Sequence, residues 1–194
     1  TRDPKAVATG TFHDLRQEQP SRKYSDFMSA TGSTTYHPVR LALYQASNRL
    51  ADWVHCLVSP YRDYGRSRLS KLLAHFNVAQ QQYFSINIVE LYNQHRYAIV
   101  GEELSGFPAL GALEAMACGC VLIAQPQYYH GLGFEPGVHY LPYDGSIDQL
   151  TKLLSANSTT DFTPLAASTA NDIKARFSSH VVFELWQKTL LDIH

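Results

Sequence analysis

Residues 102–124, EELSGFPALGALEAMACGCVLIA, constrain the fold of this chain more than any other stretch. The segment is typical of a loop, a short helix rich in small residues, a stop at Gly119 and a buried strand. Leu110, Leu113 and Ala117 are spaced to pack inward from that helix. Loop, helix and apolar strand in this order indicate an α/β fold.

Strands and helices alternate along most of the chain. The expected strands are 5–12, 53–59, 97–101, 120–124 and 138–143, and the expected helices cover 38–51, 66–76, 86–94 and the segment before Gly119. Such alternation predicts a Rossmann-like parallel sheet with helices on both faces. Ligands of sheets of this kind bind beyond the carboxyl ends of the strands.

Three trailing helices are expected over about 146–193. The first begins after Ser146, which has capping-box spacing to Gln149, and the second begins near Pro164. The third covers about 179–193, and its apolar residues Val182, Leu185, Trp186 and Leu190 align on one face. A length of 194 residues fits a single domain with a full core, 1–194.

Composition excludes several classes of protein. The net charge of −1 and the 17% of charged residues do not fit a nucleic-acid surface. The chain has no apolar run of about 20 residues for a membrane span and no secretory signal. Cys118 and Cys120 are poorly spaced for a disulfide or a metal clip, which favours reduced thiols and a cytoplasmic location. The histidines show no metal-binding spacing, and neither a GxSxG elbow nor a P-loop lysine motif occurs.

The helix entrance has the features of a phosphate site. It comprises Gly106, Phe107, Pro108, Ala109 and Leu110, and its glycine and proline let backbone approach a ligand closely. The start of a helix offers unpaired N–H groups and a positive dipole. Glu114 follows within the same helix, and a carboxylate can accept both hydroxyls of a sugar diol. Together these features indicate a nucleotide site. A plain strand-to-helix turn over 106–110 and a solvated helix residue at Glu114 are the alternative explanations.

EAMACGCVLIA, residues 114–124, resembles the signature of the group-1 glycosyltransferases, which are retaining sugar-nucleotide enzymes of the GT-B fold. The resemblance implies that Glu114 binds the ribose of the donor nucleotide and that backbone amides of 106–110 contact its diphosphate. The family also has an earlier Glu, eight positions before, which binds the donor sugar. That position is Gly106 here, so either Glu103 takes the role through a longer loop or the sugar is held differently.

The resemblance implies further contacts to the donor phosphates. Gly10 and Thr11 end the first strand, where the family has a glycine-containing loop, although a tight turn alone would explain the glycine. A basic run follows the second strand and includes Arg62, Arg66, Arg68 and Lys71. Arg62 is the first candidate for neutralising the leaving group, and Arg40 is the second. A charged helix surface is the alternative explanation of the basic run.

The loop after the fourth strand contains Tyr128, Tyr129, His130 and Gly131. It lies at the expected ligand edge, where its rings could stack on a base or meet the acceptor. Packing of the aromatic rings inside the loop is equally natural.

The resemblance therefore implies a donor-binding, carboxyl-terminal GT-B lobe of a larger two-lobe enzyme. Its substrate would be a nucleotide-diphospho-sugar, with no other cofactor, no metal and no nucleic acid. The acceptor, a saccharide, lipid or protein, would be bound with a missing amino-terminal lobe, and membrane association would come from parts outside this chain. Two alternatives stay open. One is a non-catalytic Rossmann-like binding module, which the missing first Glu favours; the other is a flavodoxin-like or dinucleotide-binding domain, for which a full GxGxxG is lacking.

Overall fold

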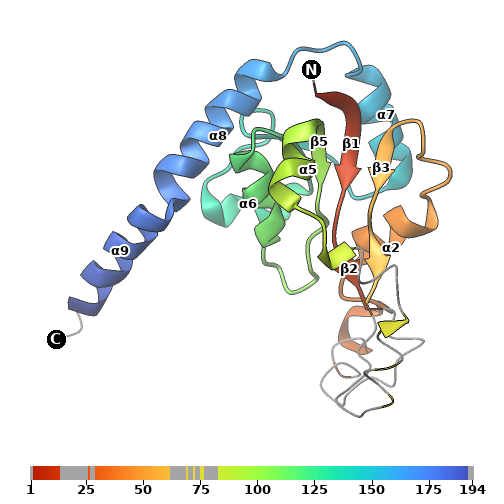
Figure 1. Cartoon of the computed structure of the whole chain (residues 1–194), viewed down its shortest axis with the longest axis horizontal. Helices are drawn as coiled ribbons and strands as arrows, with labels where there is room; N and C mark the ends of the chain where they lie inside the picture. Colours follow the sequence, from red (N-terminus) through yellow and green to blue (C-terminus); the bar gives the residue numbers. More distant parts are fainter. Residues whose placement is uncertain are drawn as a thin grey trace.

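The computed structural model describes residues 2–13, 26, 29–61, 69, 72, 75–76 and 83–191. Five parallel strands of this part form one sheet in the order β3-β1-β5-β6-β7 (Figure 1). The strands are β1 (Asp3–Ala8), β3 (Val54–Cys56), β5 (His95–Ile99), β6 (Val121–Ala124) and β7 (Tyr140–Pro142). The predicted parallel sheet is confirmed. Because β3 lies on one side of β1 and all later strands lie on the other, the direction of winding reverses between β1 and β5.

The first two predicted strands are each split in two. β2 (Thr11–Phe12) and β4 (Ser59–Pro60) follow β1 and β3 and pair with each other in a small second sheet. Gly10 separates β1 from β2 because its φ of 130° departs from the extended backbone of a strand. The break lies at the carboxyl end of β1.

Helices cover both faces of the sheet, as predicted. α2 (Pro38–Gln45) and α7 (Ile147–Ala156) pack on one face, and α5 (Ile88–Gln94) and α6 (Leu110–Ala117) pack on the other (Figure 1). α8 (Thr163–Phe177) lies against α6. Successive strand residues alternate between the two layers, so Tyr97 and Ile99 belong to the core beneath α2 and α7, while Ala98 faces α5.

Local capping interactions decide where several helices begin and end. α5 starts at Ile88, later than predicted, because the side chain of Asn87 accepts a hydrogen bond from the Glu90 backbone N–H at 3.2 Å. α2 ends at Gln45 rather than continuing to residue 51, and the Ala46 N–H closes its last turn on the Ala42 carbonyl. The predicted helix over 66–76 falls mostly outside the described residues.

The capping box predicted for α7 is half formed. The Ser146 hydroxyl accepts a hydrogen bond from the Gln149 backbone N–H at 3.2 Å, as expected. The return bond is different, because the Gln149 side chain accepts from the Asp144 N–H, and the Ser146 N–H donates to the Asp144 carboxylate at 2.7 Å. Asp144 therefore provides the second half of the cap.

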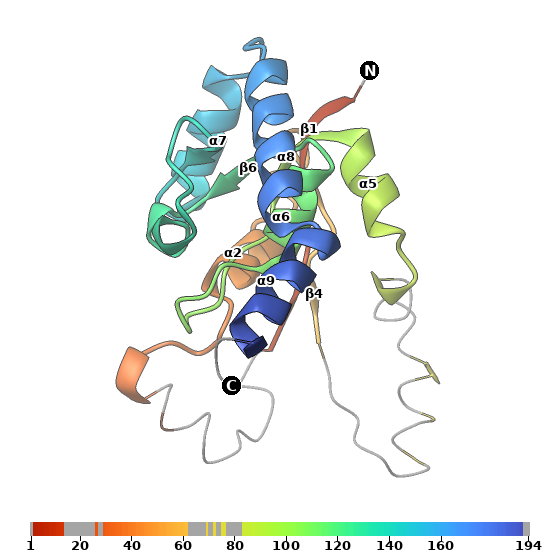
Figure 2. The same ribbon diagram turned by 90° about the vertical axis from the view of Figure 1, so that its left-hand side faces the viewer.

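α9 (Ser179–Leu191) continues from α8 and leads away from the sheet (Figures 1 and 2). The helix itself is confirmed. Its apolar residues Val182, Leu185, Trp186 and Leu190 are all exposed, so they contact no core within the described part of the chain. None of the described helices is both long enough and apolar enough to cross a membrane.

Candidate functional site

The carboxyl ends of β1 and β5 flank the point at which the winding of the sheet reverses. At such a point the connections from two neighbouring strands leave in opposite directions, which opens a crevice for ligands. Thr9, Gly10 and Thr11 follow β1, and residues 100–103 follow β5. The predicted residues Gly10, Thr11 and Glu103 therefore belong to one edge of the sheet.

The guanidinium group of Arg40 lies between these two strand ends. Its Nε is 2.9 Å from both the Val100 and the Gly101 carbonyl oxygens, and its Nη1 donates to the Thr11 carbonyl at 2.8 Å. Burial lowers the pKa of Arg40, while the hydroxyl of Tyr83 and two nearby carboxylates act in the opposite direction. An arginine remains charged even so, and the site thus contains a largely desolvated cation.

Two glycines make room for the Arg40 side chain. A Cβ on Gly10 would come within 2.6 Å of Arg40 Nε, and a Cβ on Gly101 would come within 2.9 Å of Arg40 Cγ. Gly101 also has a positive φ, 68°. The sequence predicts Gly10 to be a phosphate-loop or tight-turn glycine. The structure supplies a further reason, which is the close approach of an arginine from α2.

The side chains of His37 and Glu103 form a polar pair beside Arg40. His37 Nε2 lies 3.4 Å from Glu103 Oε1, and the Glu103 side chain is 51% exposed. Burial, helped by the positive charge of Arg40, lowers the pKa of His37 to about 4, although Glu103 acts to raise it. The imidazole is therefore neutral at pH 7.

Glu102, the acid that precedes Glu103 in the sequence, points into the interior. It is only 3% exposed, and its Oε1 accepts a hydrogen bond of 2.5 Å from the Tyr129 hydroxyl. Burial raises the pKa of the Glu102 carboxyl group. Tyr129 lies between the short 3-10 helices η1 (Pro126–Tyr128) and η2 (His130–Leu132), and its ring is fully buried. Of the two interpretations of this loop, packing is the one that holds for Tyr129.

The bond between Tyr129 and Glu102 gives a testable prediction. Tyr129→Phe is expected to lower the free energy of unfolding by about 1–2 kcal/mol, because a buried carboxyl group loses its hydroxyl partner. Chemical denaturation of the parent and the variant measures this change. Tyr44→Phe is the control, since Tyr44 is exposed, and its effect should stay within about 0.5 kcal/mol. Equal effects of the two substitutions would contradict the role given to Tyr129.

The start of α6 is open to solvent. Ala109 is its N-cap and makes no side-chain cap, and Gly106 has a φ of 86° with no atom within 4 Å of the position that a Cβ would occupy. Phe107 and Leu110 are both exposed, Leu110 by 72%. The expectation that Leu110 packs inward is wrong, because the helix begins at this residue and its side chain precedes the first buried position, Ala112.

Glu114 is exposed on α6 but borders the same edge of the sheet. A Cβ on Gly111 would lie 3.3 Å from the Tyr92 hydroxyl and 3.8 Å from Glu114 Oε2. The Tyr92 hydroxyl in turn forms a 3.0 Å hydrogen bond with Thr9 at the end of β1. Burial, with a smaller contribution from the charge of Glu114, raises the pKa of Tyr92 to about 12. Tyr92 thus links the carboxylate-bearing face of α6 to the end of β1.

A family model described as Glycosyl transferase-like matches residues 40–188, well over half of the chain. The chain belongs to this family. The match begins at Arg40, covers four of the five strands of the sheet (β3, β5, β6 and β7, but not β1) and α6, and ends within α9. No curated protein and no solved structure matches the chain.

In this glycosyl transferase-like chain the predicted site residues fall into two groups at one edge of the sheet. Gly10, Thr11 and Glu103 surround Arg40, and Gly106, Phe107, Pro108, Ala109, Leu110 and Glu114 belong to the start and first turns of α6. Arg62, with the neighbouring basic residues 66, 68 and 71, lies outside the described residues. Within the described part, no three His, Cys, Asp or Glu side chains are grouped to hold a metal ion.

Sequence reasoning missed three contributors, His37, Tyr92 and Glu102. Only His37 carried a local signal, because it precedes the proline that starts α2. The other two contact residues far away in the sequence, Tyr92 with Thr9 and Glu102 with Tyr129. No local pattern could have revealed these pairings.

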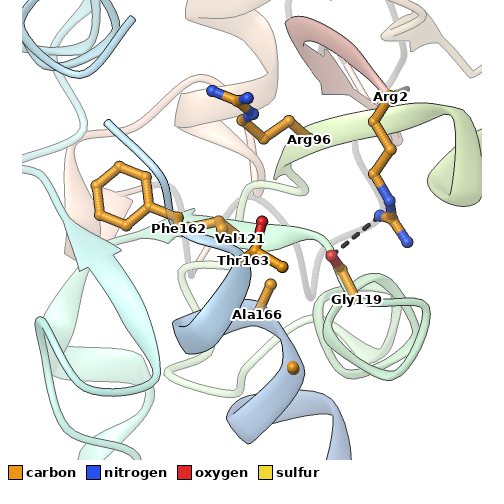
Figure 3. Close-up of a pocket in the computed structure, with 8 residues that line it drawn as sticks. Arg2, Arg96, Gly119, Val121, Phe162, Thr163 and Ala166 are labelled. Atoms are coloured by element: carbon orange, nitrogen blue, oxygen red, sulfur yellow. Dashed lines mark hydrogen bonds between the residues drawn. The ribbon is translucent and has the colours of Figure 1, made fainter. Parts of the chain in front are cut away.

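A cavity of about 470 Å³ lies at the opposite edge of the glycosyl transferase-like domain, near the amino ends of β5 and β6 (Figure 3). Its lining includes Arg2, Arg96, Gly119, Phe162 and Thr163. Arg2 donates hydrogen bonds to the carbonyls of Cys118, at 2.6 Å, and of Gly119 and His95, both at 3.0 Å. These hydrogen bonds join the start of the chain to the end of α6 and to the amino end of β5, which gives Arg2 a structural role at this edge.

Proposed function

We propose that this glycosyl transferase-like chain binds a nucleotide-diphospho-sugar across the carboxyl ends of β1 and β5 and takes part in glycosyl transfer with retention of configuration. The observation that carries the proposal is the Arg40 guanidinium, fixed by three backbone carbonyls at the reversal point of the sheet. An anionic ligand is the natural partner of a desolvated cation in such a crevice.

The diphosphate is the part of the donor that these groups would stabilise most. Breaking the bond between sugar and phosphate develops negative charge on the leaving group, and preorganised donors lower the energy of that state. Arg40, the uncapped start of α6 over 106–110 and the backbone of Gly10 and Thr11 are the proposed donors. Arg62 remains a further candidate.

The two exposed acids would bind the sugar parts of the donor. Glu114 would accept the ribose hydroxyls, which is consistent with its exposure on α6 near Tyr92. Glu103 would accept hydroxyls of the transferred sugar, which is consistent with its half-exposed carboxylate near Arg40. A cytoplasmic location belongs to the same proposal and is supported by the three free cysteines of the chain.

Titration calorimetry with UDP, GDP, ADP and CMP tests donor binding. One of these nucleotides should bind, and Glu114→Gln should weaken that binding about tenfold through the loss of charge-assisted hydrogen bonds to the ribose. Glu184→Gln, on the exposed surface of α9, is the matched control and should leave the affinity unchanged. The proposal is overturned if the folded protein binds none of the four at millimolar concentration.

A non-catalytic nucleotide-sugar-binding module is the second candidate function. The observation that favours it is Gly106, which occupies the position of the family's sugar-binding Glu and has nothing within 4 Å of its Cβ position. Such a module would bind the donor without releasing the free nucleoside diphosphate. Chromatography of nucleotide-sugars incubated with the protein and a panel of acceptors separates the two functions.

A further inference from the structure

His37 has an unusual position for a helix-capping residue. It is the N-cap of α2, yet its side chain makes no capping hydrogen bond, and the ring is directed to Glu103 instead. The residue is only 8% exposed, and its backbone N–H is already bonded to the Thr35 hydroxyl at 3.1 Å. The imidazole therefore makes no capping hydrogen bond to the start of α2 and can interact with Glu103 instead.

The surroundings of the ring decide which nitrogen carries the proton. Neutral histidine has one N–H, and the carboxylate of Glu103 can only accept a hydrogen bond. His37 Nε2 is the nitrogen near Glu103, whereas the buried Nδ1 has no partner among the described residues. The proton accordingly lies on Nε2, and the neutral ring donates to Glu103.

Glu103 is restrained on both oxygens but not saturated. Oε1 accepts from His37 and Oε2 accepts from the Ser105 hydroxyl, each at 3.4 Å. A carboxylate offers about four lone-pair sites, so two donors leave room for two more. Because the side chain is half exposed, a pair of ligand hydroxyl groups can reach the remaining sites.

We propose that His37 is a positioning residue that holds the Glu103 carboxylate toward the transferred sugar of the donor, so that it governs affinity for the sugar and not for the nucleotide. This inference rests on the proposed function. The ligand chemistry that it requires is a hydroxyl-rich hexosyl group attached to the diphosphate.

The test compares each free nucleotide with its sugar conjugate by titration calorimetry: UDP with UDP-glucose and UDP-galactose, GDP with GDP-mannose, and ADP with ADP-glucose. The parent should bind one conjugate more tightly than its nucleotide. His37→Phe keeps a ring of similar size but lacks the donor, and should weaken binding of the conjugate about tenfold while changing nucleotide binding less than twofold. His37→Gln keeps a donor N–H and should restore most of the affinity.

A double-mutant cycle separates positioning from general structural damage. If His37 acts through Glu103, His37→Phe should have no further effect on conjugate affinity in a Glu103→Ala background, which leaves the His37 N–H no side-chain acceptor at that position. His180→Phe, at an exposed position on α9, is the control and should leave both affinities unchanged. Nitrogen-15 NMR of the parent gives a measurement without substitutions, because the His37 Nε2 resonance should shift with the conjugate and not with the nucleotide.

The outcomes distinguish the inference from the proposed function. Failure of the parent to bind any nucleotide would overturn the proposed function. Tight nucleotide binding with no gain from the attached sugar, equal weakening of both ligands by His37→Phe, or an unchanged His37 resonance would each overturn the inference alone.

Discussion

Arg40→Met should lower the free energy of unfolding by about 3 kcal/mol. Methionine matches the length of the arginine stem but has no donor, so the carbonyls of Thr11, Val100 and Gly101 lose their hydrogen bonds to the guanidinium. Each buried carbonyl left without a partner costs about 1–3 kcal/mol. Because water can partly rehydrate the three carbonyls at the sheet edge, we expect the total cost to lie near the lower end of the range for three such groups.

Urea denaturation of Arg40→Met and of two comparison variants measures this effect. Arg40→Lys should fall between the parent and Arg40→Met, because one ammonium group cannot reproduce the planar array of donors. Arg49→Met removes an exposed arginine that pairs with Asp148 on the surface, and should change stability by less than about 1 kcal/mol. Similar losses in Arg40→Met and Arg49→Met would disprove the structural role of Arg40.

Acidification should destabilise the fold through His37. In the unfolded chain this histidine titrates near pH 6.5, whereas burial and Arg40 lower its pKa to about 4 in the folded protein. Between these values the unfolded state binds more protons, so stability rises with pH. The loss on going from pH 6.5 to pH 4 is about 3 kcal/mol, since one pKa unit corresponds to about 1.4 kcal/mol.

The free energy of unfolding, measured against pH for the parent and for His37→Gln, separates the contribution of His37 from that of other titrating groups. Burial also lowers the pKa of His55 and raises that of Glu102, so further groups titrate in the folded protein. Glu102 has the opposite effect on the pH dependence of stability. An acid whose pKa is raised in the folded state makes the fold less stable as the pH rises. The parent's stability should fall more steeply below pH 6.5 than that of His37→Gln. Parallel curves would show that His37 does not titrate abnormally.

The features that the sequence predicted well depend on neighbouring residues. Gly119 ends α6 with a φ of 79° in front of β6, and Ser146 caps α7 through Gln149. Alternation of apolar strands with helices was enough to predict the layered parallel sheet, because each element must bury its own apolar side. The same α6–β6 segment carried the resemblance to a glycosyltransferase family, and the family match over residues 40–188 confirms it.

The composition of the candidate site depended on distant contacts instead. Glu102 and Glu103 are adjacent acids with no local difference, yet one is buried against Tyr129 and the other is half exposed beside His37. Backbone direction at the end of β5 decides which of them faces the interior. The sequence favoured the basic residues at 62–71 over Arg40 for neutralising the leaving group. Among the described residues, it is Arg40 that lies between the two strand ends.

The sequence by itself determined the order of elements, the α/β class and the loop–helix–strand segment that ends in β6, because these follow from periodicity, glycine stops and helix caps over a few residues. Only the tertiary structure decided that Arg40 lies between two strand ends, with Gly10 and Gly101 leaving space for it. These two glycines are far apart in the sequence, and they meet the same side chain because parallel pairing of β1 with β5 brings their carboxyl ends together.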